Sequence, residues 1–209
     1  MPILFFLLLG ATALAADLPS DHPFAACAAC HGQDAQGNEE LQTPRLAGQD
    51  PVYLRQQIEA YRKGWRGGKA EEPVGIMANI AKALPAATTS AAIDYVATLT
   101  PEAKRDRVFG LRLNGEYLYR ANCAICHGDH AEGSEYHMPV LNMQHGWYLK
   151  AQIEAFRRGL RGTHGEDKAG TTMAFYAKLL KDERAVRDVA AYLSSLRVAP
   201  KAPAPETGR

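Results

Sequence analysis

The sequence predicts an all-α protein made of two copies of one small domain. Four sequence blocks occur in both halves in the same order, and the apolar residues of the longest block recur at helical spacing. No window of four to eight residues alternates apolar and polar side chains convincingly, as a half-buried strand would. A chain of 209 residues is long enough for two such domains.

The two copies are related by a shift of 95 to 97 residues. Residues 27–32 recur as 123–128, 44–46 with 53–64 as 139–141 with 148–159, 77–78 as 173–174, and 93–99 as 190–196. The constant order and the small drift in the shift are typical of a tandem duplication.

One predicted helix of the first copy has a sequence signal for its start and another for its end. Asp50 suits an N-cap, Pro51 suits the first helical position, and Gly64 is typical of the residue just beyond a last turn. The apolar side chains between these ends share one face, which we expect to be buried: Leu54, Ile58 and Tyr61.

The second copy repeats this helix and predicts a further one. Gly159 stands where Gly64 ends the first-copy helix, and the apolar face is kept as Leu149, Ile153 and Phe156. Asp182 suits the N-cap of a last helix. Its apolar residues also recur at helical spacing: Val186, Val189, Ala190 and Leu193.

Both ends of the chain are predicted to lie outside the folded domains. Residues 1–15 are apolar and too short to span a bilayer comfortably, and Ala13 with Ala15 gives the small-x-small pattern of a signal-peptide cleavage site. No Lys or Arg precedes the apolar core, so an uncleaved membrane anchor is the alternative. Both interpretations imply export. Residues 199–209 contain prolines and scattered charge, and we expect a disordered tail there.

The intervening residues divide into two domains. We expect a first domain at 16–100, a linker with the start of the second unit at 101–112, and a second domain at 113–198. The linker is rich in charge and begins with Pro101.

The charge of the chain argues against a general nucleic-acid binder. The formal net charge is +1, with 24 basic and 23 acidic residues. The charge is uneven, however, because residues 17–100 carry 7 basic and 10 acidic side chains and residues 101–209 carry 17 and 13. Such a dipole favours an oriented encounter with a charged partner protein.

All four cysteines lie in two Cys-x-x-Cys-His motifs. On a helical turn, residues at i, i+3 and i+4 share a face. Two thiols with this spacing can bond to the two vinyl groups of one haem while the histidine reaches the iron, so the motifs predict two covalently bound haem c groups. The cysteines are Cys27, Cys30, Cys123 and Cys126, and the histidines that would ligate the iron are His31 and His127.

The spacing of the cysteines admits two other interpretations. A thioredoxin-like redox pair requires an α/β pattern that the sequence does not contain. A single zinc site with four thiolates would leave both histidines without a role and would need a site shared between separate domains. Covalent haem gives a role to the cysteines and to the histidine of each motif, which neither the redox pair nor the zinc site does.

Each copy also contains a methionine at the same register. Met77 follows His31 by 46 residues, and Met173 follows His127 by the same number. A lone methionine is more often a core residue, but a matched pair favours axial ligation of the haem iron. His/Met ligation would fill both axial positions and suit electron transfer.

The second copy contains further potential ligands: Met138, Met143, His130, His137, His145 and His164. One interpretation places these histidines in solvated loops. The other lets His137, Met143 or His164 displace Met173, which would give a haem with a lower potential or a labile ligand.

The combined motifs resemble those of the dihaem cytochrome c4 family. Besides both Cys-x-x-Cys-His motifs, they include the Pro-x-Leu-x-Gly-Gln run at 44–49, Tyr-Leu-x-x-Gln-Ile at 53–58, the ends of type Tyr/Phe-x-x-Gly-x-Arg, and Met-Ala. The resemblance implies two class I cytochrome c domains, each wrapped around one haem, with the haem propionate edges facing each other. It also implies that the carbonyls of Pro44 and Pro139 accept the Nδ1–H of the ligating histidines. Plain turn prolines are the alternative for those two residues.

Arg66 and Arg161 follow the helix-ending glycines at matched positions. They are candidate partners of the haem propionates, and solvated basic helix ends are the alternative. The second copy departs from the pattern at 142–144, which read Asn-Met-Gln where residues 47–49 read Ala-Gly-Gln. Residues 159–164 also resemble dihaem cytochromes associated with oxidase subunits.

The function that these features favour is a periplasmic carrier of single electrons, with no catalytic residues of its own. The resemblance implies a donor such as a quinol-oxidising complex and an acceptor such as a terminal oxidase, and it leaves open whether the protein is free or held at the membrane. The alternative is an electron-transfer subunit of an oxidoreductase complex, such as a sulfide dehydrogenase, or a dihaem enzyme with one labile ligand. A dihaem thiosulfate dehydrogenase with a cysteine ligand is disfavoured, because the chain has no fifth cysteine.

Overall fold

The computed structural model describes residues 18–67, 74–103, 106 and 108–196. Residues 1–15 and 199–209, assigned above to a signal peptide and a tail, lie outside the described residues. Within them the chain forms nine helices and no strand, apart from one isolated bridge between Asn38 and Thr43. The all-α prediction is confirmed. No helix among the described residues is long and apolar enough to cross a bilayer.

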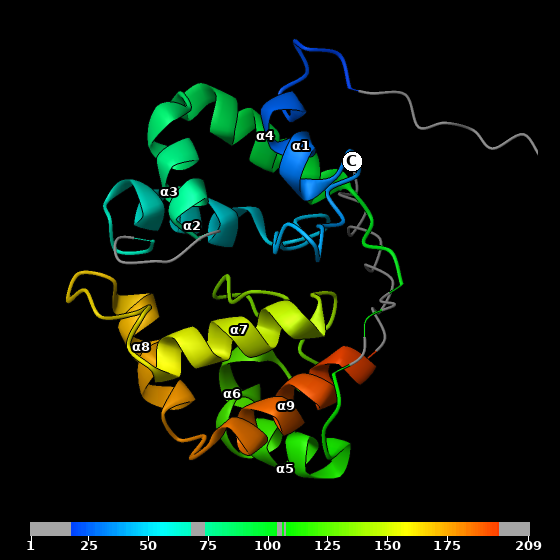
Figure 1. The fold of residues 1–209 in the computed structure, drawn as a ribbon, viewed down its shortest axis with the longest axis vertical. Coiled ribbons are helices and arrows are strands. Elements are labelled where there is room, and N and C mark those ends of the chain that lie inside the picture. The colour runs from blue at the N-terminus through cyan, green and yellow to red at the C-terminus, as the bar shows by residue number, and fades with distance from the viewer. Residues whose placement is uncertain (1–17, 68–73, 104–105, 107, 197–209) are drawn as a thin grey trace, which may run out of the picture.

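The helices form two groups that lie one above the other along the long axis of the molecule (Figure 1). The first group contains α1 (Ala25–His31), α2 (Pro51–Arg62), α3 (Val74–Ala83) and α4 (Ala86–Thr98). The second contains α5 (Arg112–Asn122), α6 (Ala124–His127), α7 (Gly146–Arg157), α8 (Lys168–Ala177) and α9 (Glu183–Ser195).

Helix α2 begins and ends where its sequence signals predict. The Asp50 carboxylate accepts a hydrogen bond from the backbone N–H of Tyr53 at 2.8 Å, and Pro51 occupies the first turn. Gly64 has φ +70°, a conformation that favours glycine beyond a helix end. Its counterpart Gly159 follows α7 with φ +71°. The matched ends give both copies a helix of the same length.

Helix α9 has the predicted N-cap and buries its predicted apolar residues. Asp182 accepts a hydrogen bond from the backbone N–H of Ala185 at 2.8 Å. The predicted apolar residues of this helix are all buried: Val186, Val189, Ala190 and Leu193. Val186, Val189 and Leu193 join a core cluster that also contains residues of α7 and α8.

Helix α5 has no counterpart in the first copy among the described residues. Residues 18–24, which precede α1, form turns, and Phe24 fills the core there with 1% of its surface exposed. In the second copy α5 packs closely on α9. The buried Asp188 of α9 accepts hydrogen bonds from the Leu111 N–H and the Asn114 side chain, both at 2.8 Å. The duplication is therefore unequal at the start of each copy.

The close approach of α5 to α9 depends on Gly115. A Cβ atom built on Gly115 would lie 1.9 Å from the backbone oxygen of Asp188. Any larger residue at this position has to push the two helices apart.

We therefore expect Gly115→Ala to lower the free energy of unfolding of the second domain by about 3 kcal/mol, the usual scale of overpacking. Urea denaturation of the haem-loaded protein would measure this. Gly165→Ala is the matched control, because a Cβ there meets nothing within 4 Å. Equal stability of the two variants would contradict the proposed clash.

Candidate functional site

Each copy has an apolar cavity among its helices. The cavity of the first copy measures about 280 Å³ and that of the second about 420 Å³. Residues predicted to bind the cofactor line both. The first cavity is lined by Cys27, Cys30, His31, Pro44 and Met77, and the second by Cys123, Cys126, His127, Pro139 and Met173.

The ring of His31 is fixed between a helix end and a proline carbonyl. His31 is the last residue of α1, and its Nδ1 lies 2.9 Å from the Pro44 carbonyl oxygen. Because a carbonyl only accepts, Nδ1 must carry the proton, and the lone pair is left on Nε2. Burial lowers the pKa of His31, and the hydrogen bond to Pro44 raises it by less. Because the pKa of the ring is lowered overall, the ring is neutral at pH 7.

His127 repeats this arrangement in the second copy. Its Nδ1 lies 3.3 Å from the Pro139 carbonyl oxygen, and burial again lowers its pKa. Both histidines are 7% exposed. Each cavity therefore receives a neutral imidazole in the tautomer that suits iron ligation.

All four cysteines are partly buried. Burial raises the pKa of Cys27, and it raises the pKa of Cys123 to about 12. A redox-active dithiol has a lowered pKa, so these values disfavour the thioredoxin-like interpretation. The two pairs line different cavities, which also disfavours one shared four-thiolate zinc site.

Met77 and Met173 occupy matched places in α3 and α8. Both are partly buried and pack against core residues of their own copy. Each lines the cavity that contains the histidine of its copy.

The other potential ligands of the second copy are more dispersed. His137 and Met138 line its cavity, and His137 also pairs with Asp50 of the first copy at 3.0 Å. Met143 is buried but lies outside the lining of both cavities, and His164 stacks on Trp65.

His145 differs from the expectation of a solvated loop histidine. Its side chain is 17% exposed, and its ring bonds the Asp106 carboxylate at 3.2 Å and the Gln36 carbonyl at 2.8 Å. The Asp106 carboxylate also accepts a hydrogen bond from the Gly146 N–H at the start of α7. Through Asp106 and Gln36, His145 therefore connects α7 to the linker and to the first copy.

Two arginines form a layer between the cavities. Arg66 donates to Gln57 of its own copy at 2.9 Å and to Gln152 of the other copy at 3.1 Å. Arg161 donates to the same two glutamines, at 2.5 Å each. The solvated-helix-end interpretation is wrong for both, because Arg66 is 6% and Arg161 8% exposed.

Aromatic rings flank this layer. Arg66 lies over the ring of Tyr61 at 4.5 Å and Arg161 over the ring of Phe156 at 4.3 Å. Arg66 also donates to the Tyr148 hydroxyl at 2.8 Å. Burial raises the pKa of Tyr61 to about 12, so its hydroxyl stays neutral at pH 7.

A second pair of contacts joins the two copies with the same symmetry. The Gln144 side chain accepts the Arg45 N–H at 3.1 Å and donates to the Arg45 carbonyl at 2.9 Å. The Gln49 side chain does the same for Val140, at 2.9 and 3.1 Å. Each glutamine thereby clamps the backbone directly after the histidine-binding proline of the other copy.

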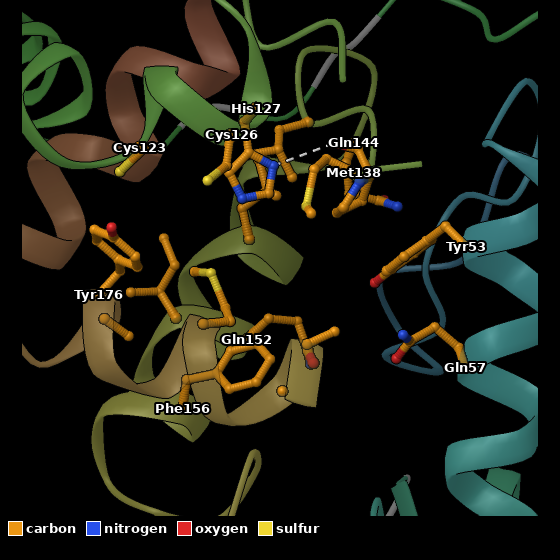
Figure 2. A pocket seen from close by; sticks show the side chains of 18 of the residues that line it. Tyr53, Gln57, Cys123, Cys126, His127, Met138, Gln144, Gln152, Phe156 and Tyr176 are labelled. Carbon is orange, nitrogen blue, oxygen red and sulfur yellow. Dashed lines mark hydrogen bonds between the residues drawn. The ribbon is translucent and has the colours of Figure 1, made fainter. Parts of the chain in front are cut away.

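The second cavity is closed partly by the first copy. Figure 2 shows Tyr53 and Gln57 of α2 at one side of the cavity, facing the group that contains His127, Cys126 and Met138. Six residues line both cavities: Pro44, Leu54, Gln57, Arg66, Tyr148 and Gln152. The cavities are thus neighbours across one shared wall.

Comparison with known proteins agrees with the repeat and with the paired sites. The sequence profile of the cytochrome c family matches residues 22–100 and again residues 113–197. The solved structure of cytochrome c4 from Acidithiobacillus ferrooxidans is 29% identical to this chain, with a TM-score of 0.68, and the alignment covers 83% of this chain and 99% of that one. This chain belongs to the dihaem cytochrome c4 family.

Two relatives of this cytochrome are named for thiosulfate dehydrogenase. The thiosulfate dehydrogenase electron acceptor of Stutzerimonas stutzeri strain A1501 is 32% identical over 82% of this chain and 79% of its own length. The thiosulfate dehydrogenase TsdBA of Marichromatium purpuratum is 32% identical with a TM-score of 0.64. That alignment covers 86% of this chain but 37% of TsdBA, so this cytochrome spans less than half of that enzyme.

The cytochrome carries two covalent haem c groups, and the cavities fit them. Each contains a Cys-x-x-Cys-His motif, a neutral imidazole and a predominantly apolar wall. The apolar wall of the second cavity includes Leu141, Leu149, Ile153, Phe156, Leu180 and Val189. The buried Nε atoms of Arg45 and Arg66 have no hydrogen-bond partner among the described residues, which suits an acidic group placed beside the shared wall.

Sequence reasoning missed the glutamines of the interface. Gln57 and Gln152 lie at matched places in one repeated block, and Gln49 and Gln144 each follow another repeated block by three residues. A polar residue that both copies retain beside buried apolar positions is the signal that could have identified them.

We expect Gln144→Ala to lower the free energy of unfolding by about 2 kcal/mol, because it leaves the buried N–H and carbonyl of Arg45 without partners. Denaturant unfolding of the haem-loaded cytochrome measures this. Gln56→Ala, at an exposed position of α2, should change stability by less than about 0.5 kcal/mol. A similar effect of both substitutions would show that the clamp is unimportant.

Proposed function

We propose that this cytochrome is a periplasmic carrier of single electrons that passes them between its two haems across the shared wall of the cavities. The observation that carries this proposal is the set of six residues that line both cavities. Because the cavities adjoin, an electron received by one domain can leave through the other.

The axial ligands that we propose are His31 with Met77 and His127 with Met173. A c-type haem with two protein ligands supplies one-electron oxidation and reduction without an open coordination site. The proline carbonyls hold each imidazole in place through Nδ1, which leaves Nε2 for the iron. The half-buried methionines of α3 and α8 supply thioethers from the same cavities.

Arg66 and Arg161 are proposed to pair with haem propionates. Both are buried cations beside the shared wall, and the Nε of Arg66 is unpaired among the described residues. The glutamines that bind them orient both guanidinium groups. Positive charge held here would offset the propionate charge of two adjacent haems.

Export is proposed from the predicted signal peptide at residues 1–15. We propose that a quinol-oxidising complex supplies electrons and that a terminal oxidase accepts them. The opposite charge of the two halves favours docking in a fixed orientation, and added salt should slow such encounters.

A second candidate function is an electron-transfer subunit of an oxidoreductase, and the likeness to a thiosulfate dehydrogenase electron acceptor and to TsdBA favours it. In that role thiosulfate dehydrogenase, rather than a quinol-oxidising complex, would be the donor. A labile ligand in the second domain would favour a dihaem enzyme instead.

Carbon monoxide tests the proposed ligands. We expect it to leave the optical spectrum of the reduced cytochrome unchanged, because both axial positions are filled. Met77→Ala and Met173→Ala should each produce a shift on about half of the haem. Met138→Leu is the matched control, since Met138 lines the same cavity as Met173.

A shift in the unaltered cytochrome would contradict the carrier function and favour the enzyme. If Met138→Leu opened the site and Met173→Ala did not, the proposed ligand of the second haem would be wrong.

Stopped-flow mixing distinguishes the two donors. We expect a reduced quinol-oxidising complex to reduce the cytochrome at a rate that falls as ionic strength rises. Faster reduction by thiosulfate dehydrogenase in the presence of thiosulfate would instead support the subunit role.

A further inference from the structure

A short stretch at the start of the second domain exposes large apolar side chains. Phe109 is 89% exposed, Leu111 67%, Leu113 84% and Tyr117 70%. These four residues, called here the α5 surface, lie within nine consecutive positions. Grouped apolar side chains of this size on a protein surface indicate an interaction site.

The α5 surface faces away from both haem cavities. On the same helix Gly115 and Tyr119 are buried, and Tyr119 lines the second cavity. Leu113 and Tyr117, four residues apart, lie on the opposite side of α5. In Figure 1, α5 lies at the end of the molecule that is farthest from the first domain.

Basic side chains accompany the apolar ones. Arg112 and Arg120 are exposed on α5 itself. Arg187 of α9 is also exposed, and a Cβ on Gly110 would lie 2.9 Å from its backbone oxygen. Glu116 is the acidic residue on this part of α5, and it pairs with Arg120 at 3.0 Å. The exposed Asp129 also lies close enough to Arg120 to interact with it. Because Glu116 and Asp129 face Arg120, the positive charge beside the α5 surface comes from Arg112 and Arg187.

This region is held firmly although it is exposed. Asp188, which is 1% exposed, accepts hydrogen bonds from Leu111 N–H and Asn114. Phe109, Leu111 and Arg112 lie between the two stretches that match the cytochrome c profile. The first copy has no equivalent helix among its described residues. Within the part of the chain that the structure describes, the first copy therefore has no counterpart of the α5 surface.

We propose that the α5 surface docks this cytochrome onto an anionic lipid bilayer. Protruding Phe, Leu and Tyr side chains enter the boundary between headgroups and acyl chains, while neighbouring arginines meet lipid phosphates. A redox partner that bound to this surface would lie far from both haems, because the α5 surface faces away from the cavities. Electron exchange requires a partner close to the haem edges. Docking by this end would leave those edges accessible, which goes beyond the proposed carrier function.

Vesicle sedimentation tests this proposal with the haem-loaded cytochrome. We expect binding to vesicles that contain phosphatidylglycerol and weak binding to vesicles of phosphatidylcholine alone. Phe109→Ser with Leu113→Ser should weaken binding at least about tenfold, because two apolar side chains no longer enter the bilayer. Arg112→Gln should weaken it about fivefold and reduce its dependence on salt.

The control is Leu160→Ser with Phe175→Ser, two exposed apolar residues of the same domain outside the α5 surface. It should bind vesicles like the unaltered cytochrome, and all variants should keep the haem spectrum. No binding to anionic vesicles, or equal loss in the control, would overturn the proposal. A dimer in sedimentation velocity that Leu113→Ser dissociates would also overturn it, since a second copy would then cover this surface.

A fluorescence measurement gives an independent readout. Leu113→Trp places an indole on the α5 surface without altering the buried face of α5. Its emission should shift to shorter wavelength when anionic vesicles are added. An unchanged emission maximum with vesicle-bound protein would show that another surface makes the contact.

Discussion

The position of one imidazole ring in each domain is the constraint on which the other contacts depend. His31 and His127 end short helices, and a proline carbonyl holds each ring through Nδ1. The prolines are held in turn, because the next residue of each copy is clamped by a glutamine of the other copy. Ligand geometry and domain arrangement are therefore parts of one connected set of hydrogen bonds.

The interface differs from an ordinary contact between domains, because its centre is charged and buried. Arg66 and Arg161 are removed from water, and such burial is costly without partners. Glutamine carbonyls and aromatic faces meet part of that cost. Acidic edges of the two haems would supply the counter-charge that the protein chain does not. Burial of the two arginines therefore costs less free energy in the haem-loaded protein than in the polypeptide alone.

Much of this architecture could be predicted from the sequence, because duplication doubles every signal. The cap at Asp50, the stops at Gly64 and Gly159, and the haem-binding motifs all have local causes that a sequence displays. Helix α5 was not predicted, since it lacks a counterpart in the first copy and its packing depends on Gly115 meeting a distant helix. The burial of Arg66 and His145 was also missed, because it arises only when the two copies come together.

The paired glutamine clamps have an evolutionary consequence. Their arrangement is that of an isologous contact, in which the same patch on two identical subunits meets itself about a two-fold axis. In a homodimer every substitution at such a contact appears twice, so it must be compatible with its own image. Fusion into one chain removes that condition. Arg45 and Val140 now occupy equivalent places with different side chains, which gives each haem an environment that can be adjusted separately.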